Sequence, residues 1–245
     1  MFYKFRLVLI GLIYFFGLEI ISLKMSLLPI VLAFLLLLAL FEGKKIGKKW
    51  KFSILPVFFV FFSVLLLSFI SSAYEQQIFI VLASGMFYLL ALGTYRLEEY
   101  AGDKTARGML MAITTTTIFF SLTVSYGLYL NFLVPLYVLM LDYLVVTFLV
   151  SYQYFSIIEK EQKKVFLYSF ILALIMAEII WAMNFWPFGY LTTGVVMLIL
   201  YYVLWDLTQS YFLNLLSRKR VITNMIFFSA MIIMVLLSAK WIPVI

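Results

Sequence analysis

The chain of 245 residues contains no cysteine and no histidine. The first absence excludes disulfides and thiolate metal sites, and the second removes the commonest metal ligand and the side chain that titrates near neutral pH. Histidine-ligated haem and histidine-based catalytic triads are excluded for the same reason. We therefore expect no metal site and no cofactor, and any chemistry must use carboxylate, amine, guanidinium, amide or hydroxyl groups.

Charge is also scarce. Only 12% of the residues are charged while 66% are hydrophobic, and the mean hydropathy is +1.14. A soluble chain of this length does not have such a composition, which indicates a polytopic membrane protein. The bias toward Lys, Ile, Phe and Tyr is typical of AT-rich bacterial genomes, so we expect an integral protein of a bacterial plasma (inner) membrane.

The hydrophobic residues fall into about nine runs separated by short polar breaks. A bilayer core of about 30 Å is crossed by about 20 apolar residues in a helix. The runs are continuous rather than alternating, which excludes transmembrane β-strands. The sequence predicts an all-α bundle, a single transmembrane domain over residues 1–245. The expected spans are 7–23, 26–43, 52–73, 78–95, 109–130, 132–155, 165–186, 190–214 and 221–241.

The basic residues predict how the chain is threaded. Lys and Arg are retained on the cytoplasmic side of a membrane when connections are short. If the N-terminus is inside, all of the 18 Lys and Arg residues except Lys24 and Lys240 lie on the cytoplasmic side. We expect the N-terminus in the cytoplasm and the C-terminus outside, with antiparallel hairpins joined by short outer turns. These turns are "LKMS", "YEQQ", "LNF" and "WPFG".

The net charge of +7 follows from the same bias. The lysines between Lys44 and Lys51 would meet anionic lipid headgroups, so membrane lipids are the expected partners. No basic domain is large enough to bind nucleic acid. The sequence identifies no protein partner.

Proline and glycine give little sign of broken helices. Pro29, Pro56 and Pro135 fall in the first turns of predicted spans, where a missing N–H costs little, and Pro187 and Pro243 lie at ends. Proline-interrupted helices of the kind that build transporter sites are therefore not indicated. Four glycines favour close helix packing over local unwinding: Gly85, Gly93, Gly127 and Gly194.

Hydroxyl side chains form a stripe on the fifth expected span. They recur at spacings of three and four and so share one helix face. Packing against a neighbouring helix is favoured over a polar conduit, because small hydroxyls can satisfy themselves on backbone carbonyls. The stripe consists of Thr114, Thr117, Ser121 and Ser125.

Three acids lie well inside predicted spans: Asp142 near mid-membrane, Glu178 in the outer half and Asp206 in the inner half, and Glu19 is a fourth, shallower candidate near the outer end of the first span. A charged acid at a helix centre costs roughly 2.5–3.5 kcal/mol, so such residues are functional candidates. No Lys or Arg is expected deep enough to be an obvious counter-ion. The alternative is that each acid is protonated and joins helices through hydrogen bonds.

The neighbours of these acids complete the set of candidate substrate- or ion-binding residues. Tyr202, Asp206 and Gln209 share a helix face, which we expect to point into the bundle. Glu178 shares a face with Trp181 and Phe185, and Asn184 lies on an adjoining face. The candidates are Glu178, Asp206, Asp142, Tyr202, Trp181, Asn184 and Gln209.

The stretch "AEIIWAMNFWPFGYLTTGVVMLILYYVLWDL" resembles a group of uncharacterised multi-pass membrane proteins from reduced-genome bacteria. The shared pattern is a helix with Glu then Trp, a proline turn and a tyrosine-rich helix. The resemblance implies no activity. It implies only that Glu178, Trp181, Pro187, Tyr201 and Tyr202 belong to one structural unit.

Three functions fit these observations. The first is a carrier or channel-like protein in which Glu178 and Asp206 bind protons or cations between the last helices. The second is a membrane-embedded enzyme for a lipid or polyprenyl substrate, for which the loop "TYRLEEYAGDKTARG" supplies carboxylates and arginines, although solvated loop charges are the commoner explanation. The third is a non-catalytic scaffold subunit. The carrier is the leading interpretation, because the expected spans leave no extramembrane domain.

Overall fold

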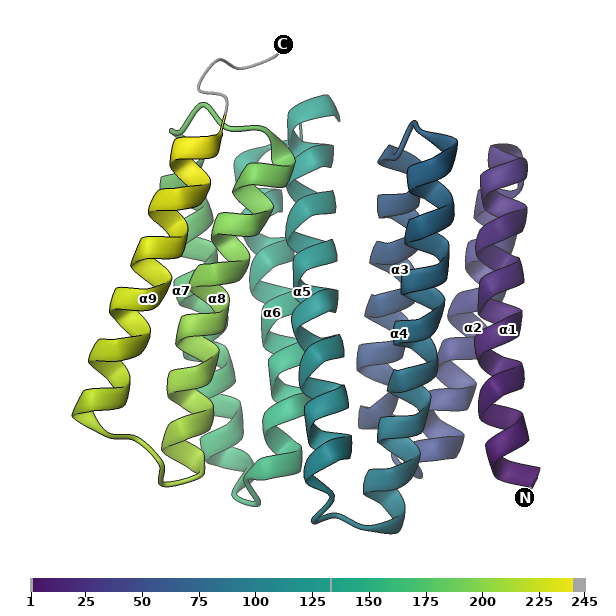
Figure 1. Cartoon of the computed structure of the whole chain (residues 1–245), viewed down its shortest axis with the longest axis horizontal. Coiled ribbons are helices and arrows are strands. Elements are labelled where there is room, and N and C mark those ends of the chain that lie inside the picture. Colours follow the sequence, from purple (N-terminus) through teal and green to yellow (C-terminus); the bar gives the residue numbers. More distant parts are fainter. Residues whose placement is uncertain (1, 133, 240–245) are drawn as a thin grey trace. The chain divides into compact units, whose positions relative to one another are not determined.

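The computed structural model describes residues 2–132 and 134–239, so Lys240 and Pro243 lie outside the described residues. Within these ranges the chain is all helical (Figure 1). Its nine α-helices are all long and apolar enough to cross a membrane, which confirms the predicted fold class at this level. The elements are α1 (Phe2–Leu23), η1 (Met25–Leu27), α2 (Leu28–Gly47), η2 (Trp50–Ser53), α3 (Ile54–Phe69), α4 (Ala73–Glu99), α5 (Lys104–Phe132), α6 (Leu136–Ile158), α7 (Gln162–Met183), α8 (Tyr190–Phe212) and α9 (Arg218–Ser238).

Two of the predicted turns are helical. The "YEQQ" segment lies in the first turn of α4, where the Gln76 amide donates to the Ile70 carbonyl at 2.7 Å and Ser22 Oγ donates to Gln76 Oε1 at 2.8 Å. The "LNF" segment ends α5, and Asn131 Nδ2 donates to the Gly127 carbonyl at 2.7 Å. The prediction was wrong here because polar residues at helix ends, which bond to nearby backbone, resemble turn residues in sequence.

The chain forms two compact units, residues 1–117 and 118–245, and the boundary falls inside α5. In the first unit α1 packs on α4, and α2 packs on both α3 and α4. The Tyr14 ring lies 4.4 Å from that of Phe87 and 6.2 Å from that of Phe59, and the Tyr14 hydroxyl shares a 2.6 Å hydrogen bond with Ser63 Oγ. Aromatic rings therefore form the centre of this unit. Its organisation with the second unit as one domain stays a prediction.

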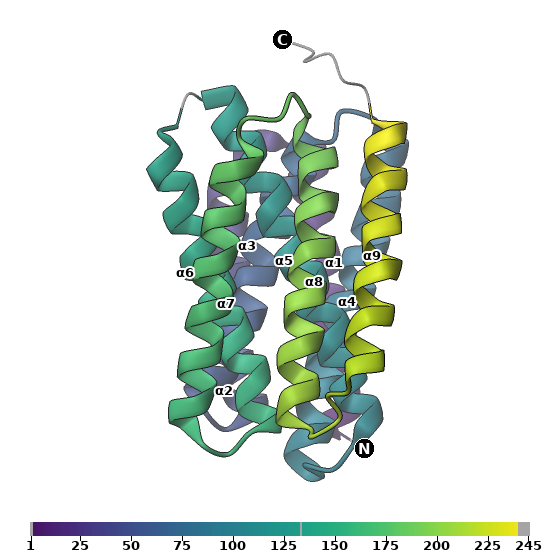
Figure 2. The ribbon, with the colours of Figure 1, turned by 90° about the vertical axis from the view of Figure 1, so that its left-hand side faces the viewer.

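In the second unit α6 packs on α7, and α8 contacts α6, α7 and α9 (Figure 2). Trp205 of α8 is fully buried, with its ring 4.9 Å from that of Tyr154 and 6.3 Å from that of Phe155. Helix α9 packs beside α8 and has no buried residue. The core of this unit therefore excludes α9, which is attached at its edge.

The glycines mark two close helix contacts in continuous helices. A Cβ at Gly194 of α8 would overlap Thr123 Oγ1 of α5, and one at Gly93 of α4 would lie 3.3 Å from Met109 Cβ. At Gly194 and Gly93 the prediction of close helix packing, rather than local unwinding, is therefore confirmed. Gly85 differs, because a Cβ there would have no neighbour within 4 Å.

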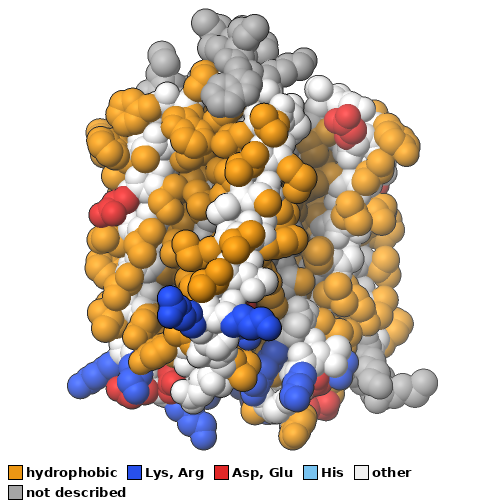
Figure 3. Space-filling model, turned by 60° about the vertical axis from the view of Figure 1, so that its left-hand side comes forward, with side chains coloured by type: hydrophobic (Ala, Val, Ile, Leu, Met, Phe, Trp, Pro, Cys, Tyr) orange, Lys and Arg blue, Asp and Glu red, His pale blue; other side chains and the backbone are white. Residues whose placement is uncertain are grey.

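Every one of the nine helices exposes large hydrophobic side chains. On the face drawn in Figure 3, such side chains form a broad surface, and Lys and Arg gather along its lower border. Exposed apolar side chains with basic residues at their border are expected of a membrane-embedded protein.

Candidate functional site

The Asp206 carboxylate lies between α8 and α9, and both of its oxygens are bonded. Arg220 Nη2 donates to Oδ1 at 3.1 Å, and Asn224 Nδ2 donates to Oδ2 at 2.6 Å. The Asp206 side chain is 10% exposed and that of Arg220 is 40% exposed. Arg220 and Asn224 are four residues apart and so share one face of α9. We call these three residues the α8–α9 polar clamp.

The connection between the two helices positions the clamp. Asn214 adopts a positive φ of 54°, a left-handed conformation that Asn tolerates, and the Leu215 amide bonds to the Ser210 carbonyl at 2.8 Å. Ser217 then caps α9, because its Oγ accepts a hydrogen bond from the Arg220 amide at 3.3 Å. The cap starts α9 at Arg218 and places Arg220 in the first turn, beside Asp206.

The prediction that no Lys or Arg would be a counter-ion was therefore wrong for Asp206. The last expected span starts at residue 221, which leaves Arg218, Lys219 and Arg220 outside it, whereas α9 begins at Arg218. Ser217 was the available signal, since Ser is a preferred residue at helix N-termini. Asn224 was missed because a single amide in an apolar run does not reveal its partner.

An aromatic contact also joins α9 to α8. The ring of Phe228 lies 5.3 Å from that of Tyr202. An ion pair inside a membrane-spanning segment is costly to desolvate, and it is stable only while both partners remain in place. Because α9 buries no residue, the polar clamp has a large share in holding it against α8.

Tyr202, Asp206 and Gln209 share a face of α8 but contact different neighbours. Tyr202 and Asp206 contact α9, whereas Gln209 Oε1 accepts a hydrogen bond from the Tyr154 hydroxyl of α6 at 3.3 Å. Asp206 is buried, and the other two are half-buried. The polar face of α8 is thus divided between two helix contacts.

Asp142 joins two helices. Ser125 Oγ of α5 donates to Asp142 Oδ2 of α6 at 2.5 Å, and no Lys or Arg in the described ranges forms an ion pair with it. Ser125 belongs to the hydroxyl stripe of α5, in which Thr117 and Ser121 donate to backbone carbonyls of the preceding turn. This geometry matches the interhelical hydrogen bond that was the alternative for the intramembrane acids.

Glu178 lies apart from both other acids. Its side chain is exposed on α7, and it has no hydrogen bond or ion pair to another described residue. Trp181 is 51% exposed and packs edge-on against Phe185 with ring centroids 5.5 Å apart, while Asn184 is half-buried at the C-terminal end of α7. The structure therefore does not bring Glu178 into the α8–α9 polar clamp.

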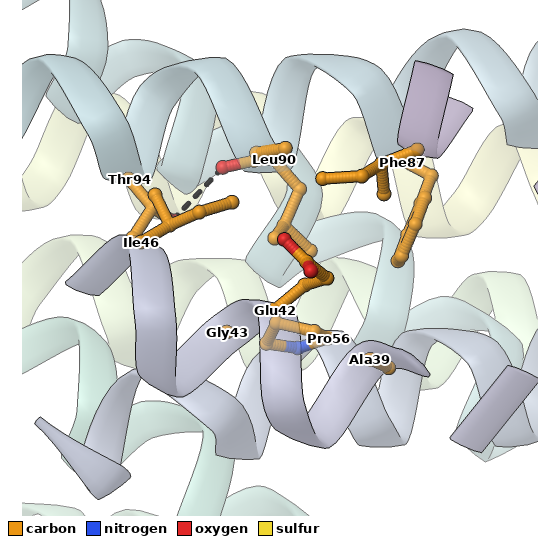
Figure 4. Close-up of a pocket in the computed structure, with 10 residues that line it drawn as sticks. Ala39, Glu42, Gly43, Ile46, Pro56, Phe87, Leu90 and Thr94 are labelled. Atoms are coloured by element: carbon orange, nitrogen blue, oxygen red, sulfur yellow. Dashed lines mark hydrogen bonds between the residues drawn. The ribbon is translucent and has the colours of Figure 1, made fainter. Parts of the chain in front are cut away.

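A second interhelical ion pair lies in the unit of residues 1–117. Arg6 of α1 donates to Glu42 of α2, and each side chain is about one-quarter exposed, at 24% and 23%. Figure 4 shows the Glu42 carboxylate pointing from α2 toward α4, at a cavity of about 10 Å³, which is roughly the space of one water molecule. Glu42 is not among the predicted candidates because it lies at the end of the expected span 26–43, whereas α2 continues to Gly47.

In the charged loop between α4 and α5, Asp103 forms hydrogen bonds with nearby residues. Asp103 Oδ1 accepts hydrogen bonds from the Thr105 and Ala106 amides at 2.9 and 3.1 Å, and Oδ2 accepts one from Arg96 Nε at 2.7 Å. The Ala106 amide and the Arg96 guanidinium hold the pKa of Asp103 below its usual value, although partial burial opposes them. Asp103 therefore caps α5.

Three other charged groups of that loop also have partners. Arg107 Nη2 donates to the Ala101 carbonyl at 2.8 Å, Glu98 pairs with Lys48 at 2.9 Å, and Glu99 accepts from the Tyr95 hydroxyl. The loop charges thus organise the loop and its neighbours. No group of three or more acids in the described ranges could hold a metal ion.

A family model for proteins of unknown function, DUF5656, matches residues 4–238. No curated protein and no solved structure matches the chain. The match covers every described helix except the first residues of α1. The chain belongs to the DUF5656 family.

Proposed function

We propose that this protein crosses a bacterial plasma membrane nine times, with antiparallel neighbouring helices, its N-terminus in the cytoplasm and its C-terminus outside. The support is the distribution of charge over the connections. Basic residues occur at the start of α1 and either in the α2–α3 and α6–α7 connections or in the helix turns that adjoin the α2–α3, α4–α5, α6–α7 and α8–α9 connections, whereas the other connections in the described ranges and their adjoining turns contain only Lys24.

We further propose that it is a carrier or channel-like protein whose responsive element is the α8–α9 polar clamp. The observation that carries this proposal is a buried carboxylate, Asp206, bonded by Arg220 and Asn224 of a helix that buries no residue. Intramembrane ion pairs of this kind are expensive and mark ion pathways or coupling sites.

The proposed mechanism is competition for Asp206. A proton or monovalent cation that binds the carboxylate weakens its attraction to Arg220, and α9 then loses a principal attachment to α8. Ligand binding shifts a conformational equilibrium only when it differs in affinity between two states, and the clamp provides such a difference. Few apolar contacts of α9 have to break, because it has no buried side chain.

The other candidate residues take different parts in this proposal. Tyr202 supports the clamp through its contact with Phe228, and Gln209 links α8 to α6. Asp142 is a structural contact with Ser125. Glu178, with Trp181 and Asn184 nearby, is a separate exposed acid of the outer half and is not required for the clamp.

The test is ion movement into reconstituted vesicles. Purified protein is placed in liposomes containing a pH-sensitive or sodium-sensitive dye, and an inward-driving potential is applied. We expect uptake above that of protein-free vesicles, and at least a ten-fold lower rate for Asp206→Asn. Glu159→Gln, an acid in the α6–α7 connection, is the matched control and should keep the wild-type rate.

Two results would refute the carrier proposal. One is uptake no faster than in protein-free vesicles for a correctly folded wild-type sample. The other is an unchanged rate in Asp206→Asn. Helical content and thermal stability measured for each variant separate loss of transport from loss of fold.

A non-catalytic scaffold subunit is the second candidate. The exposure of α9 favours it, since seven large hydrophobic side chains of this helix are exposed and available for contact with another membrane protein. This candidate predicts folded protein, no ion uptake and no effect of Asp206→Asn in the same vesicles.

A further inference from the structure

A groove lies between α1 and α4 in the unit of residues 1–117. It has a volume of about 340 Å³ and is lined by residues between Val8 and Phe15 of α1 and by Ser84, Gly85 and Tyr88 of α4. Pockets for small molecules occupy roughly 300–1,000 Å³ and combine apolar walls with a few polar groups. Val8 is 45% exposed and Leu12 is 50% exposed, so the groove opens at the surface of the unit.

Two hydroxyl groups of the groove have no hydrogen-bond partner in the described part of the chain. Ser84 is 9% exposed, and its buried Oγ is unbonded. Tyr88, four residues later on the same helix face, likewise forms no hydrogen bond. By contrast, Thr94 on the same helix donates to the Leu90 carbonyl at 2.9 Å. Buried hydroxyls usually have a partner, so the unbonded Ser84 Oγ indicates a missing acceptor, and the half-buried Tyr88 offers a second free donor on the same helix face.

Gly85 keeps the groove open. A Cβ at this position would meet nothing within 4 Å, so the absence of a side chain does not serve helix packing. Gly11 on the opposite wall differs, because a Cβ there would lie 3.4 Å from Tyr88 Cβ. The space beside Gly85 is therefore available to a ligand.

We propose that this groove binds a lipid-soluble molecule with a carbonyl-bearing ring, of the quinone class, which enters from the bilayer. Phe15 and Tyr88 supply aromatic walls, and Ser84 and Tyr88 supply hydrogen-bond donors for the carbonyl oxygens. The groove lies near the middle of α1 and α4. In the proposed membrane-spanning arrangement this is a depth at which water is absent and an unpaired hydroxyl is costly.

Two other occupants fit these features less well. A lipid acyl chain would fill the volume but would leave both hydroxyls unpaired. A helix from a second copy of the chain would need an interface of about 20–30 residues on each side, whereas seven residues line the groove. The size and the donor pair together favour a small ring with acceptor oxygens. This site is independent of the α8–α9 polar clamp.

The experiment is photolabelling of the full chain in lipid nanodiscs with an azido-benzoquinone that bears a short alkyl tail. Mass spectrometry of the digested protein locates and quantifies the label. We expect it on the α1 and α4 segments that line the groove, and we expect excess unlabelled benzoquinone to displace it. Ser84→Ala and Tyr88→Phe should each weaken binding about five-fold, the effect of one lost hydrogen bond.

Gly85→Leu is the decisive variant. The new side chain enters open space, so the protein should fold normally while labelling falls at least ten-fold. Gly108→Leu is the matched control, because a Cβ at Gly108 of α5 also has no neighbour within 4 Å, and its labelling should equal that of the wild type. Melting temperatures verify that both variants are folded.

Three results would overturn the proposal. Labelling that is unchanged in Gly85→Leu would show that the groove is not the binding site. Equally strong labelling by an azido-alkane, insensitive to Ser84→Ala and Tyr88→Phe, would show an acyl-chain site. A change of oligomeric state in Gly85→Leu without benzoquinone labelling of the wild type would show that a second copy occupies the groove.

Discussion

The Asp206 carboxyl group has both of its hydrogen-bond partners on α9 and none on its own helix α8. Its two oxygens accept hydrogen bonds from Arg220 and Asn224 of α9, so its stability depends on residues from another helix. Removing one partner of a buried ion pair leaves the other unpaired, and this costs more than removing both. The clamp should therefore behave as a coupled unit in mutagenesis.

The first prediction concerns this coupling. Arg220→Gln should lower the free energy of unfolding by about 1–3 kcal/mol, less than for a fully buried pair because solvent screens the partly exposed Arg220. Combining it with Asp206→Asn should cost at least about 1 kcal/mol less than the sum of the single changes. Unfolding in mixed detergent micelles, followed by circular dichroism, gives these values. Additive effects would mean that the pair is not coupled.

The sequence predicted the intramembrane acids but not their environments. Asp142, Glu178 and Asp206 all stand out as carboxylates in apolar runs, yet one contacts a serine, one is exposed and one is ion-paired. Glu42 did not stand out, although it pairs with Arg6 across two helices. Such partners depend on which helix faces meet, and residue spacing within one helix does not determine this.

At the scale of the helix, Gly194 sets the approach of α5 and α8. The second prediction is that Gly194→Ala lowers the free energy of unfolding by about 1–3 kcal/mol, because its Cβ would overlap Thr123 Oγ1. Thr123→Ala should recover part of the loss in the double variant. Gly85→Ala is the control and should not destabilise, since its Cβ meets open space. Equal effects at the two glycines would contradict the close approach.

The start of α5 provides the third prediction. Asp103→Asn should speed hydrogen exchange of the Thr105 and Ala106 amides, because both amides donate hydrogen bonds to the Asp103 carboxylate. Because the pKa of Asp103 lies below its ordinary value of 3.8, its stabilisation is present above that value and is lost as the pH falls through the lowered pKa. The ratio of exchange rates, variant to wild type, should therefore approach one in strong acid. A ratio independent of pH would exclude a charge-dependent cap.

Helix positions were predictable to within a few residues because each apolar run is long enough to span a bilayer and is bounded by polar residues. The largest errors fell at the starts of α1, α4 and α5, and at the start of α4 the polar Gln76 bonds to backbone at a helix end, as Asn131 does at the end of α5. The groove beside Gly85 was not predictable from the sequence. A glycine that allows two helices to approach closely and a glycine that faces open space are the same residue in a sequence.

At the scale of the whole molecule, the proposed threading leads to the fourth prediction. The natural chain has no cysteine, so a single cysteine can be labelled without background. In intact cells a membrane-impermeant maleimide should label Lys24→Cys, between α1 and α2, but should label Lys160→Cys, between α6 and α7, only after permeabilisation. The opposite pattern would reverse the orientation, and labelling of both in intact cells would refute the alternation.

The most direct test of the proposed carrier is whether Asp206 holds α9 against α8. Spin labels at Leu191→Cys and Leu237→Cys, both on exposed residues of these helices, report their separation by pulsed electron resonance. We predict a single narrow distance distribution with native Asp206 and a broader, longer one with Asp206→Asn, while Glu178→Gln leaves it unchanged. Identical distributions with and without the Asp206 carboxylate would contradict the role of the α8–α9 polar clamp.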